Sequence, residues 1–323
     1  MTQAKRIFLL GGTGTIGRAT VRALVARGHE VVCFLRNRDA INHPALAGAE
    51  LRFGSILDRS SLEQDGLCGE RFDAVLSTLA SRTGFARDAW AVDYQAHREM
   101  LDVAREAGIP QMVLLSAICV QKPRLAFQHA KLAFEKELVE SGLTYSIVRP
   151  TAFFKSLSGQ VSRLRSGKPY IMFGDGSMTS CKPVSDRDLA AFLADCLNDP
   201  CKANKILPIG GPGEAITPRQ QGELIFAALG QKPKFRSVPL ALLTGAHGLL
   251  SALGSVSQSF ADKAELAAIG LYYASESMLV LDPVTGRYDP QLTPSTGQDT
   301  LASYYADLVS GLVRDDRGDH AVF

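Results

Sequence analysis

The chain has 323 residues, enough for one large domain or for a domain with a smaller second region. Its hydrophobic share of 46% and charged share of 21% are ordinary for a soluble globular protein. The formal net charge of +2 is close to neutral, so we expect no nucleic-acid partner.

The cysteines and the N-terminal residues bear on the compartment. The six cysteines form no Cys-x-x-Cys pair and have no clustered histidine partners, so we expect reduced, mostly buried thiols and no metal site. Apolar strand residues begin at Ile7, directly after Lys5 and Arg6, which predicts that no signal or transit peptide precedes the fold. We therefore expect a cytoplasmic protein.

Strands and helices alternate through the first half of the chain. A strand over 6–10, a helix over 16–27 and a strand over 29–35 form a β-α-β unit. The alternation continues with strands over 74–78, 112–116 and 145–148 and helices over 92–106 and 127–139. This pattern predicts an α/β protein with a Rossmann-type, doubly wound parallel sheet.

The alternation weakens after Pro150, where Gly, Pro and aromatic residues become frequent. A helix over 186–197 and a strand over 205–209 then follow, and we expect both to return to the main sheet. The predicted division is a nucleotide-binding domain over 1–150, joined by 186–211, and a smaller, discontinuous substrate region over 151–185 and 212–323.

One segment, 237–261, contains no Asp, Glu, Lys or Arg and is rich in leucine. Its length approaches that of a membrane span, but Pro239, Gly245 and Gly248 dilute its apolar character. We favour a buried or pocket-lining helix, with contact to a membrane surface as the alternative and a true span as the weakest interpretation.

A glycine-rich turn follows the first strand and opens the first helix, with the sequence Gly-Gly-Thr-Gly-Thr-Ile-Gly. Glycine allows the tight turn and a close backbone approach to a pyrophosphate, and the helix N-terminus offers unpaired N–H groups. The pattern alone is weak, but its position between strand and helix favours a dinucleotide site. The expected contacts are Gly11, Thr13, Gly14, Thr15, Ile16 and Gly17.

The end of the second strand favours NADP over NAD. NAD sites usually place a carboxylate there, whereas this chain has Arg36 and Arg38 and no acid before Asp39. A guanidinium can hold a 2′-phosphate in a bidentate way that a carboxylate cannot. Arg18 is a candidate for a second contact, and the predicted cofactor is NADPH.

Three further residues are candidates for the cofactor site. Asp58 follows the third strand, where it can contact the adenine amino group or instead cap a helix. Ser77 and Thr78 end the fourth strand and should border the ribose side of the cofactor.

These features resemble the short-chain dehydrogenase/reductase superfamily over about residues 5–210. That resemblance implies a Ser, Tyr and Lys constellation, of which the chain keeps Ser116 and Lys131 but has Phe127 in place of the Tyr. Phenylalanine has no proton to give, so the carbonyl-reducing mechanism does not carry over. The arrangement resembles the atypical branch with isoflavone-reductase-like and NmrA-like proteins.

Longer runs resemble the NADPH-dependent divinyl chlorophyllide a 8-vinyl reductases of chlorophyll and bacteriochlorophyll synthesis. The matching runs are 114–123, 145–157, 168–176, 207–213, 272–278 and 293–297. The resemblance implies reduction of the C8 vinyl group of a chlorin pigment to ethyl, with Lys131 and Ser116 as catalytic candidates. Water or Lys131 can supply the proton. An NmrA-like redox sensor without turnover and an isoflavone-reductase-like enzyme on another conjugated substrate remain as alternatives.

The implied substrate is a chlorophyllide-type pigment that needs an apolar pocket with a few polar groups. Phe153 and Phe154 follow the sixth strand, at the edge where such sheets bind ligands, and are candidates for its wall or for simple core packing. Lys155 is a candidate partner of the pigment propionate or an ordinary surface lysine. The segment 237–261 can line this pocket or touch a photosynthetic membrane, and the oligomeric state stays open.

Overall fold

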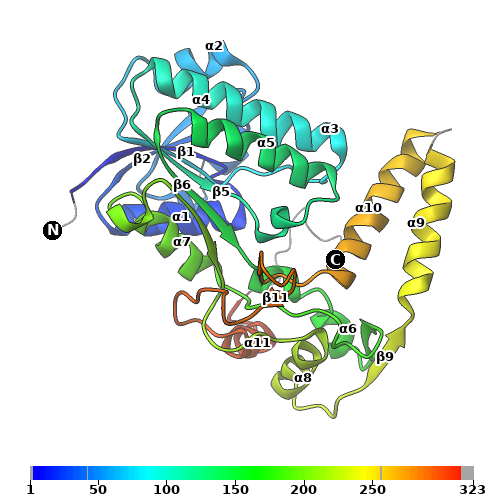
Figure 1. Cartoon of the computed structure of the whole chain (residues 1–323). Coiled ribbons are helices and arrows are strands. Elements are labelled where there is room, and N and C mark those ends of the chain that lie inside the picture. The colour runs from blue at the N-terminus through cyan, green and yellow to red at the C-terminus, as the bar shows by residue number, and fades with distance from the viewer. Residues whose placement is uncertain (1–2, 42, 255–256, 314–323) are drawn as a thin grey trace.

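A parallel sheet forms the centre of the computed structural model, which describes residues 3–41, 43–254 and 257–313 (Figure 1). Its seven strands run in the order β3-β2-β1-β4-β5-β6-β8, all neighbours being parallel. Their bounds are β1 Arg6–Leu10, β2 Glu30–Leu35, β3 Glu50–Phe53, β4 Ala74–Ser77, β5 Gln111–Leu115, β6 Thr144–Pro150 and β8 Lys205–Ile209. The predicted Rossmann-type fold is confirmed, and the strand order reverses between β1 and β4, where such sheets bind ligands.

Helices cover both faces of the sheet (Figure 1). Side chains of β1 alternate between two apolar cores, with Ile7 and Leu9 in one and Phe8 and Leu10 in the other. The first core holds α1 (Thr15–Ala26) and α7 (Asp186–Asp195), and the second holds α4 (His97–Glu106) and α5 (Ala126–Glu140). Because β1 is buried on both faces, its sequence is a continuous apolar run rather than an alternating one.

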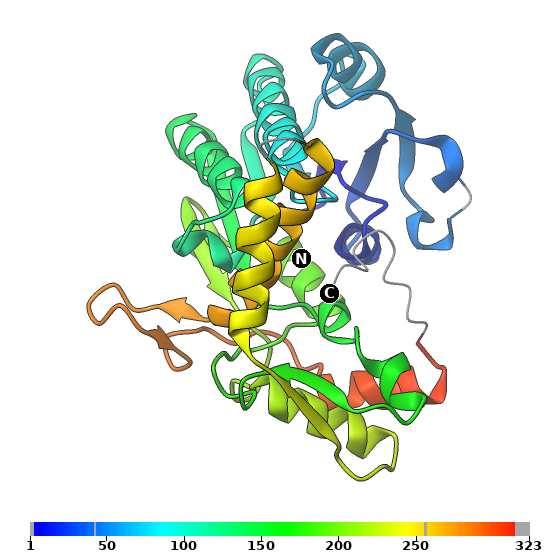
Figure 2. The same ribbon diagram turned by 90° about the vertical axis from the view of Figure 1, so that its right-hand side faces the viewer.

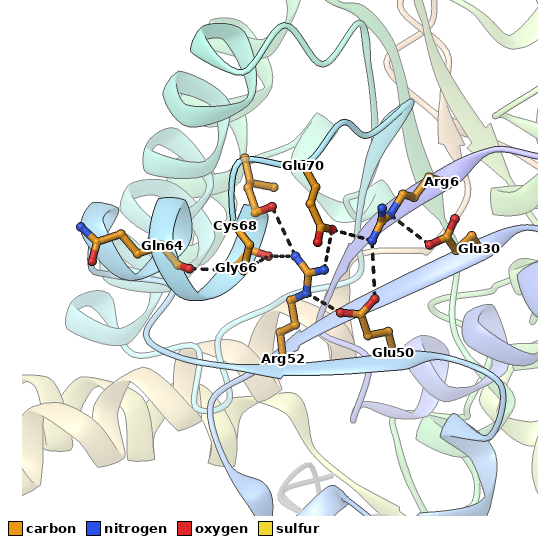
Figure 3. A network of polar contacts seen from close by, with 9 residues as sticks. Arg6, Glu30, Glu50, Arg52, Gln64, Gly66, Cys68 and Glu70 are labelled. Atoms are coloured by element: carbon orange, nitrogen blue, oxygen red, sulfur yellow. Dashed lines mark hydrogen bonds and ion pairs between the residues drawn. The ribbon is translucent and has the colours of Figure 1, made fainter.

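An ion network joins the starting ends of the strands, opposite to the ends where ligands bind (Figure 3). Arg6 contacts Glu30, Glu50 and Glu70 at 3.2, 3.5 and 2.5 Å. Arg52 contacts Glu50 at 2.7 Å and Glu70 at 2.6 Å, and hydrogen bonds from Arg52 lower the pKa of Glu70. The network connects β1, β2 and β3 at their amino ends. It does not involve the carboxyl ends, where ligands of such sheets bind.

The C-terminal half builds a third, smaller core around Tyr305 and Phe226. Its elements are α6 Val161–Arg165, β7 Tyr170–Phe173, α8 Pro218–Ala228, β9 Phe235–Val238 and α11 Leu301–Ser310. Strand β7 pairs with β9 in parallel, and β10 (Val280–Leu281) pairs with β11 (Tyr288–Asp289). The segment 186–209 belongs with the main sheet instead. Its strand β8 pairs with β6, and its helix α7 packs on α1.

Two helices, α9 (Leu240–Gly254) and α10 (Gln258–Ser275), pack side by side and project from one side of the molecule, with α9 outermost (Figures 1 and 2). Ile269 and Tyr272 attach α10 to the body. Helix α9 has no buried residue among those described, and Leu242 and Leu249 are 64% and 65% exposed. The buried alternative is therefore wrong for α9, and a pocket-lining role stays a prediction. None of the described helices is both long and apolar enough to cross a membrane.

Candidate active site

The loops that follow five strands carry most of the predicted site residues. The carboxyl ends of parallel strands share one edge of the sheet, so these loops meet there. They are the glycine turn after β1, Arg36 after β2, Thr78 to Ser81 after β4, Ser116 after β5 and Phe153 to Lys155 after β6.

The glycine turn fits tightly against its neighbours. Gly11 has a φ of +79°, and a Cβ there would lie 2.7 Å from the backbone nitrogen of Leu79 in the loop after β4. A Cβ at Gly17 would lie 2.0 Å from the carbonyl oxygen of Gly11, so α1 packs directly on the turn. The N–H of Gly14 donates to that same oxygen at 3.1 Å.

Helix α1 begins at Thr15 with its backbone donors available to a ligand. Gly14 at the N-cap provides no capping side chain, and no acidic residue lies in the first turn. Thr13 is exposed, whereas the side chain of Ile16 packs in the core, so Ile16 would meet a ligand through its backbone. This N-terminus fits a pyrophosphate, because N–H groups and the helix dipole both favour an anion.

Lys155 reaches the same helix end from the other half of the chain. It lies in a 3-10 turn (Phe154–Leu157) after β6, and its Nζ donates to Thr15 Oγ1 at 2.7 Å. The two predicted alternatives were a pigment propionate and an ordinary surface position, and the structure brings the ammonium to the glycine turn. Phe154 packs in the C-terminal core, 5.5 Å from the ring of Tyr304, and Phe153 packs against the main core. Core packing therefore accounts for both aromatic rings.

Arginines gather after β2 without a competing carboxylate. Arg36 is exposed, and the guanidinium of Arg38 lies 4.9 Å from the ring centre of Phe53. The Asp39 carboxylate accepts from the side-chain amide of Asn37, and the Asp39 backbone N–H donates to Asn37 Oδ1 at 3.0 Å. A 2′-phosphate at this strand end would meet cations and no free acid.

His43 is a further polar residue near this region that the sequence did not single out. Its Nδ1 accepts from the backbone N–H of Ala45 at 3.1 Å, and its Nε2 lies 3.1 Å from Arg18 Nη1. In the neutral ring Nε2 then carries the proton, so two donors face each other.

Two of the predicted cofactor residues, Asp58 and Thr78, form hydrogen bonds within the protein. Asp58 accepts from the backbone N–H of Ser60 at 3.0 Å and caps the short helix α2 (Arg59–Ser61), so the capping alternative is correct. Thr78 Oγ1 donates to the carbonyl oxygens of Leu10 at 3.1 Å and Gly11 at 3.2 Å. It therefore ties β4 to the glycine turn.

Ser77 is fully buried beneath the site and contacts His97. Its Oγ lies 2.7 Å from His97 Nε2, and His97 Nδ1 lies 2.9 Å from the carbonyl oxygen of Val92. That carbonyl can only accept, so Nδ1 carries the proton and Nε2 accepts from Ser77. Burial lowers the pKa of His97 to about 4, which keeps the ring neutral. Ser77 therefore fixes the end of β4, and its place beside the cofactor ribose stays a prediction.

Lys131 is paired with a buried carboxylate that sequence reasoning missed. Its Nζ lies 2.8 Å from Asp93 Oδ1, and the Asp93 side chain is 0% exposed. Asp93 lies in a π-helical segment (Trp90–Ala96) between α3 (Ala86–Ala89) and α4. The predicted helix over 92–106 therefore begins earlier. Its first part is a π-helix, in which hydrogen bonds join residues five apart, a feature frequent at functional sites.

Ser116 is turned toward a second buried ion pair. Its hydroxyl donates to Glu135, and Glu135 also pairs with Arg149. The predicted catalytic serine thus has a structural partner on α5.

Phe127 occupies the position where the superfamily has its Tyr. The ring packs with Cys119, Ile269 and Tyr272 where α10 meets the body. The Tyr272 hydroxyl donates to the carbonyl oxygen of Cys119 at 2.8 Å, so it does not replace the missing Tyr.

All six cysteines are free, and four are buried, while Cys68 and Cys201 are exposed. Burial raises the pKa of Cys33 to about 12, so its thiol is inert. Within the described ranges, no three His, Cys, Asp or Glu side chains are grouped to hold a metal ion.

Comparisons with known proteins agree with this geometry. A family model described as NAD(P)H-binding matches residues 11–200. Divinyl chlorophyllide a 8-vinyl-reductase, chloroplastic, from Oryza sativa subsp. indica is 48% identical over 98% of this chain and 82% of its own length. The protein of the same name from Cucumis sativus is 47% identical over 98% and 79%.

The fold is shared with more distant reductases. The binary complex of leucoanthocyanidin reductase and NADPH from Vitis vinifera matches with a TM-score of 0.69 at 14% identity. The match covers 94% of this chain and 99% of that one. At this identity the likeness concerns the fold alone.

Proposed function

The chain belongs to the divinyl chlorophyllide a 8-vinyl-reductase family, and on that basis we propose that it reduces the C8 vinyl group of a chlorophyllide-type pigment to ethyl, with NADPH as reductant. The observation that carries the proposal is the 48% identity to a named reductase over 98% of the chain. The reaction belongs to chlorophyll or bacteriochlorophyll synthesis.

The residues of the glycine turn fit the cofactor. A Cβ at Gly11 or Gly17 would collide with backbone, and the start of α1 offers backbone donors to phosphate. When bound, NADPH supplies the hydride that reduces the vinyl group. Arg36 and Arg18 would hold the 2′-phosphate, and Lys155 would neutralise the pyrophosphate beside Thr15.

The chemistry tolerates the loss of the superfamily Tyr at Phe127. Reduction of a vinyl group conjugated to a macrocycle places negative charge in the ring, so no alkoxide forms that needs a nearby acid. Catalysis then depends on holding cofactor and pigment in contact. Lys131 would bind the nicotinamide ribose, while we assign Ser116 a structural role through Glu135.

We also propose how the chain divides this work. Residues 1–150 with 186–211 would hold the cofactor, and 151–185 with 212–323 would hold the pigment. Strands β7 and β9, helix α8 and the pair α9 and α10 belong to this second part.

A peripheral membrane contact through 237–261 is the remaining proposal. Leu242, Leu249 and Leu253 of α9 are exposed on an uncharged helix, and exposed Arg236 stands at its base. A surface with leucines flanked by a cation suits the interface of an anionic membrane. Co-sedimentation with anionic vesicles tests it, and Leu249→Glu should reduce binding while turnover on detergent-dissolved pigment stays intact.

One assay tests the function itself. The purified chain is incubated with divinyl chlorophyllide a and NADPH, and the Soret band and chromatographic retention of the pigment are followed. We expect a small blue shift and conversion to the 8-ethyl product. Bound NADPH with no pigment turnover would favour a redox sensor, and turnover only on another conjugated substrate would favour an isoflavone-reductase-like enzyme.

A further inference from the structure

The buried Asp93 carboxylate, which pairs with Lys131, accepts hydrogen bonds at both of its oxygens. Asp93 Oδ1 accepts from Lys131 Nζ at 2.8 Å and from the backbone N–H of Ser81 at 3.2 Å. Asp93 Oδ2 accepts from Ser81 Oγ at 2.6 Å. Three donors therefore meet the Asp93 carboxylate, and a carboxylate without solvent contact needs such partners.

The pair connects α5 to the loop that borders the glycine turn. Ser81 follows β4, and in the same loop the Thr78 hydroxyl donates to the carbonyl oxygen of Gly11. Lys131 is thereby fixed relative to the cofactor cradle from two sides. One N–H of its ammonium serves Asp93, and two remain for a ligand.

The other titratable groups around the pair do not share its proton. His97 on α4 is neutral, because burial lowers its pKa to about 4. Burial raises the pKa of Cys119 after β5, so that thiol is neutral as well. Glu135, one turn along α5, is paired with Arg149. Lys131 therefore provides the cation for Asp93 among these groups.

Loss of the Lys131 proton would leave a buried, uncompensated carboxylate. Removing one partner of a buried ion pair is strongly destabilising, whereas replacing both is often tolerated. A proton donor must release its proton in each cycle, so this pairing works against that role. The pairing favours an ammonium that binds and orients the ligand over one that gives up a proton.

Resting on the proposed function, we infer that Asp93 is a positioning residue that holds the Lys131 ammonium at the nicotinamide ribose, and that water supplies the proton completing the ethyl group. The hydride forms one C–H bond at the vinyl group. Water forms the second C–H bond and leaves hydroxide, which the buffer neutralises.

Cofactor binding without pigment tests the first half. In Asp93→Asn, NADPH affinity should fall about tenfold, because the ammonium that meets the ribose loses the carboxylate that orients it. Asp102→Asn, a half-buried carboxylate on α4, is the matched control and should behave as wild type. A variant that binds NADPH like wild type overturns the positioning role.

If Asp93→Asn does not fold, the double variant Asp93→Asn with Lys131→Met removes both charges and tests the same point. It should bind NADPH about tenfold more weakly than wild type. A double variant with wild-type affinity overturns the inference.

Turnover of the double variant Asp93→Asn with Lys131→Met at saturating NADPH tests the proton source. We expect the loss to fall mainly on the KM for NADPH, with kcat reduced by less than about tenfold. A fall in kcat of about a hundredfold, the scale of general-acid catalysis, would assign the proton to Lys131. Absence of vinyl reduction by the wild-type chain would defeat the proposed function, while the binding measurements would still decide the role of Asp93.

Discussion

Replacing Lys155 with methionine separates two ligands that this side chain can serve. Its Nζ lies 2.7 Å from Thr15 Oγ1, at the helix end that fits the pyrophosphate. A hydrogen bond between charged groups contributes about 1.5–3 kcal/mol, and the half-buried position favours the lower part of that range. We therefore expect NADPH affinity to fall about 10- to 30-fold, since about 1.4 kcal/mol is a factor of ten.

The pattern of the loss identifies the phosphate group involved. NADPH and NADH share the pyrophosphate, so Lys155→Met should weaken both by the same factor in calorimetry, and added salt should shrink the difference from wild type. The KM for pigment should not change. Lys168→Met, at an exposed lysine, is the control. Unchanged NADPH affinity with a raised pigment KM would refute this reasoning. It would indicate that Lys155 binds the pigment propionate instead.

Three other outcomes are expected. Arg36→Ala should weaken NADPH binding about tenfold or more and leave NADH binding unchanged, because only NADPH carries the 2′-phosphate; equal losses would contradict the assignment. Ser116→Ala should lower the free energy of unfolding by about 1–3 kcal/mol, measured by urea denaturation, by leaving Glu135 short of one donor, with turnover intact. His97 is held neutral, so between pH 6.5 and about 4 the unfolded chain binds a proton that the folded chain does not. Stability should therefore fall by about 3 kcal/mol as pH drops through that window, and His97→Gln should flatten the drop; an equal drop in the variant would disprove it.

The first half of the fold was predictable because its signals are local. Strand β1, helix α1 and the glycine turn between them are encoded within a few consecutive residues. Helix α9 was misjudged because an uncharged, leucine-rich sequence shows that a surface is apolar but not what covers it. Its neighbour α10 covers only one side.

The site residues were harder to predict because their roles depend on distant partners. Lys155 and Thr15 are 140 residues apart in the chain, and nothing near either one signals the contact. Asp93 is one acid within a helical pattern, and only the fold shows that it points inward at Lys131. Ser116 was placed at the correct strand end, but the sequence did not show that Glu135 binds its hydroxyl.

The contacts between the glycine turn and the end of β4 affect how fast the cofactor can bind. The Thr78 hydroxyl and the close approach of Gly11 to Leu79 lock the turn in place during folding, before any dinucleotide arrives. Little backbone freedom is then left to lose on association, so the entropic cost of binding is small. We expect the dinucleotide to bind such a rigid turn without a prior conformational change. Differences in affinity among variants of the turn should therefore lie mainly in the dissociation rate.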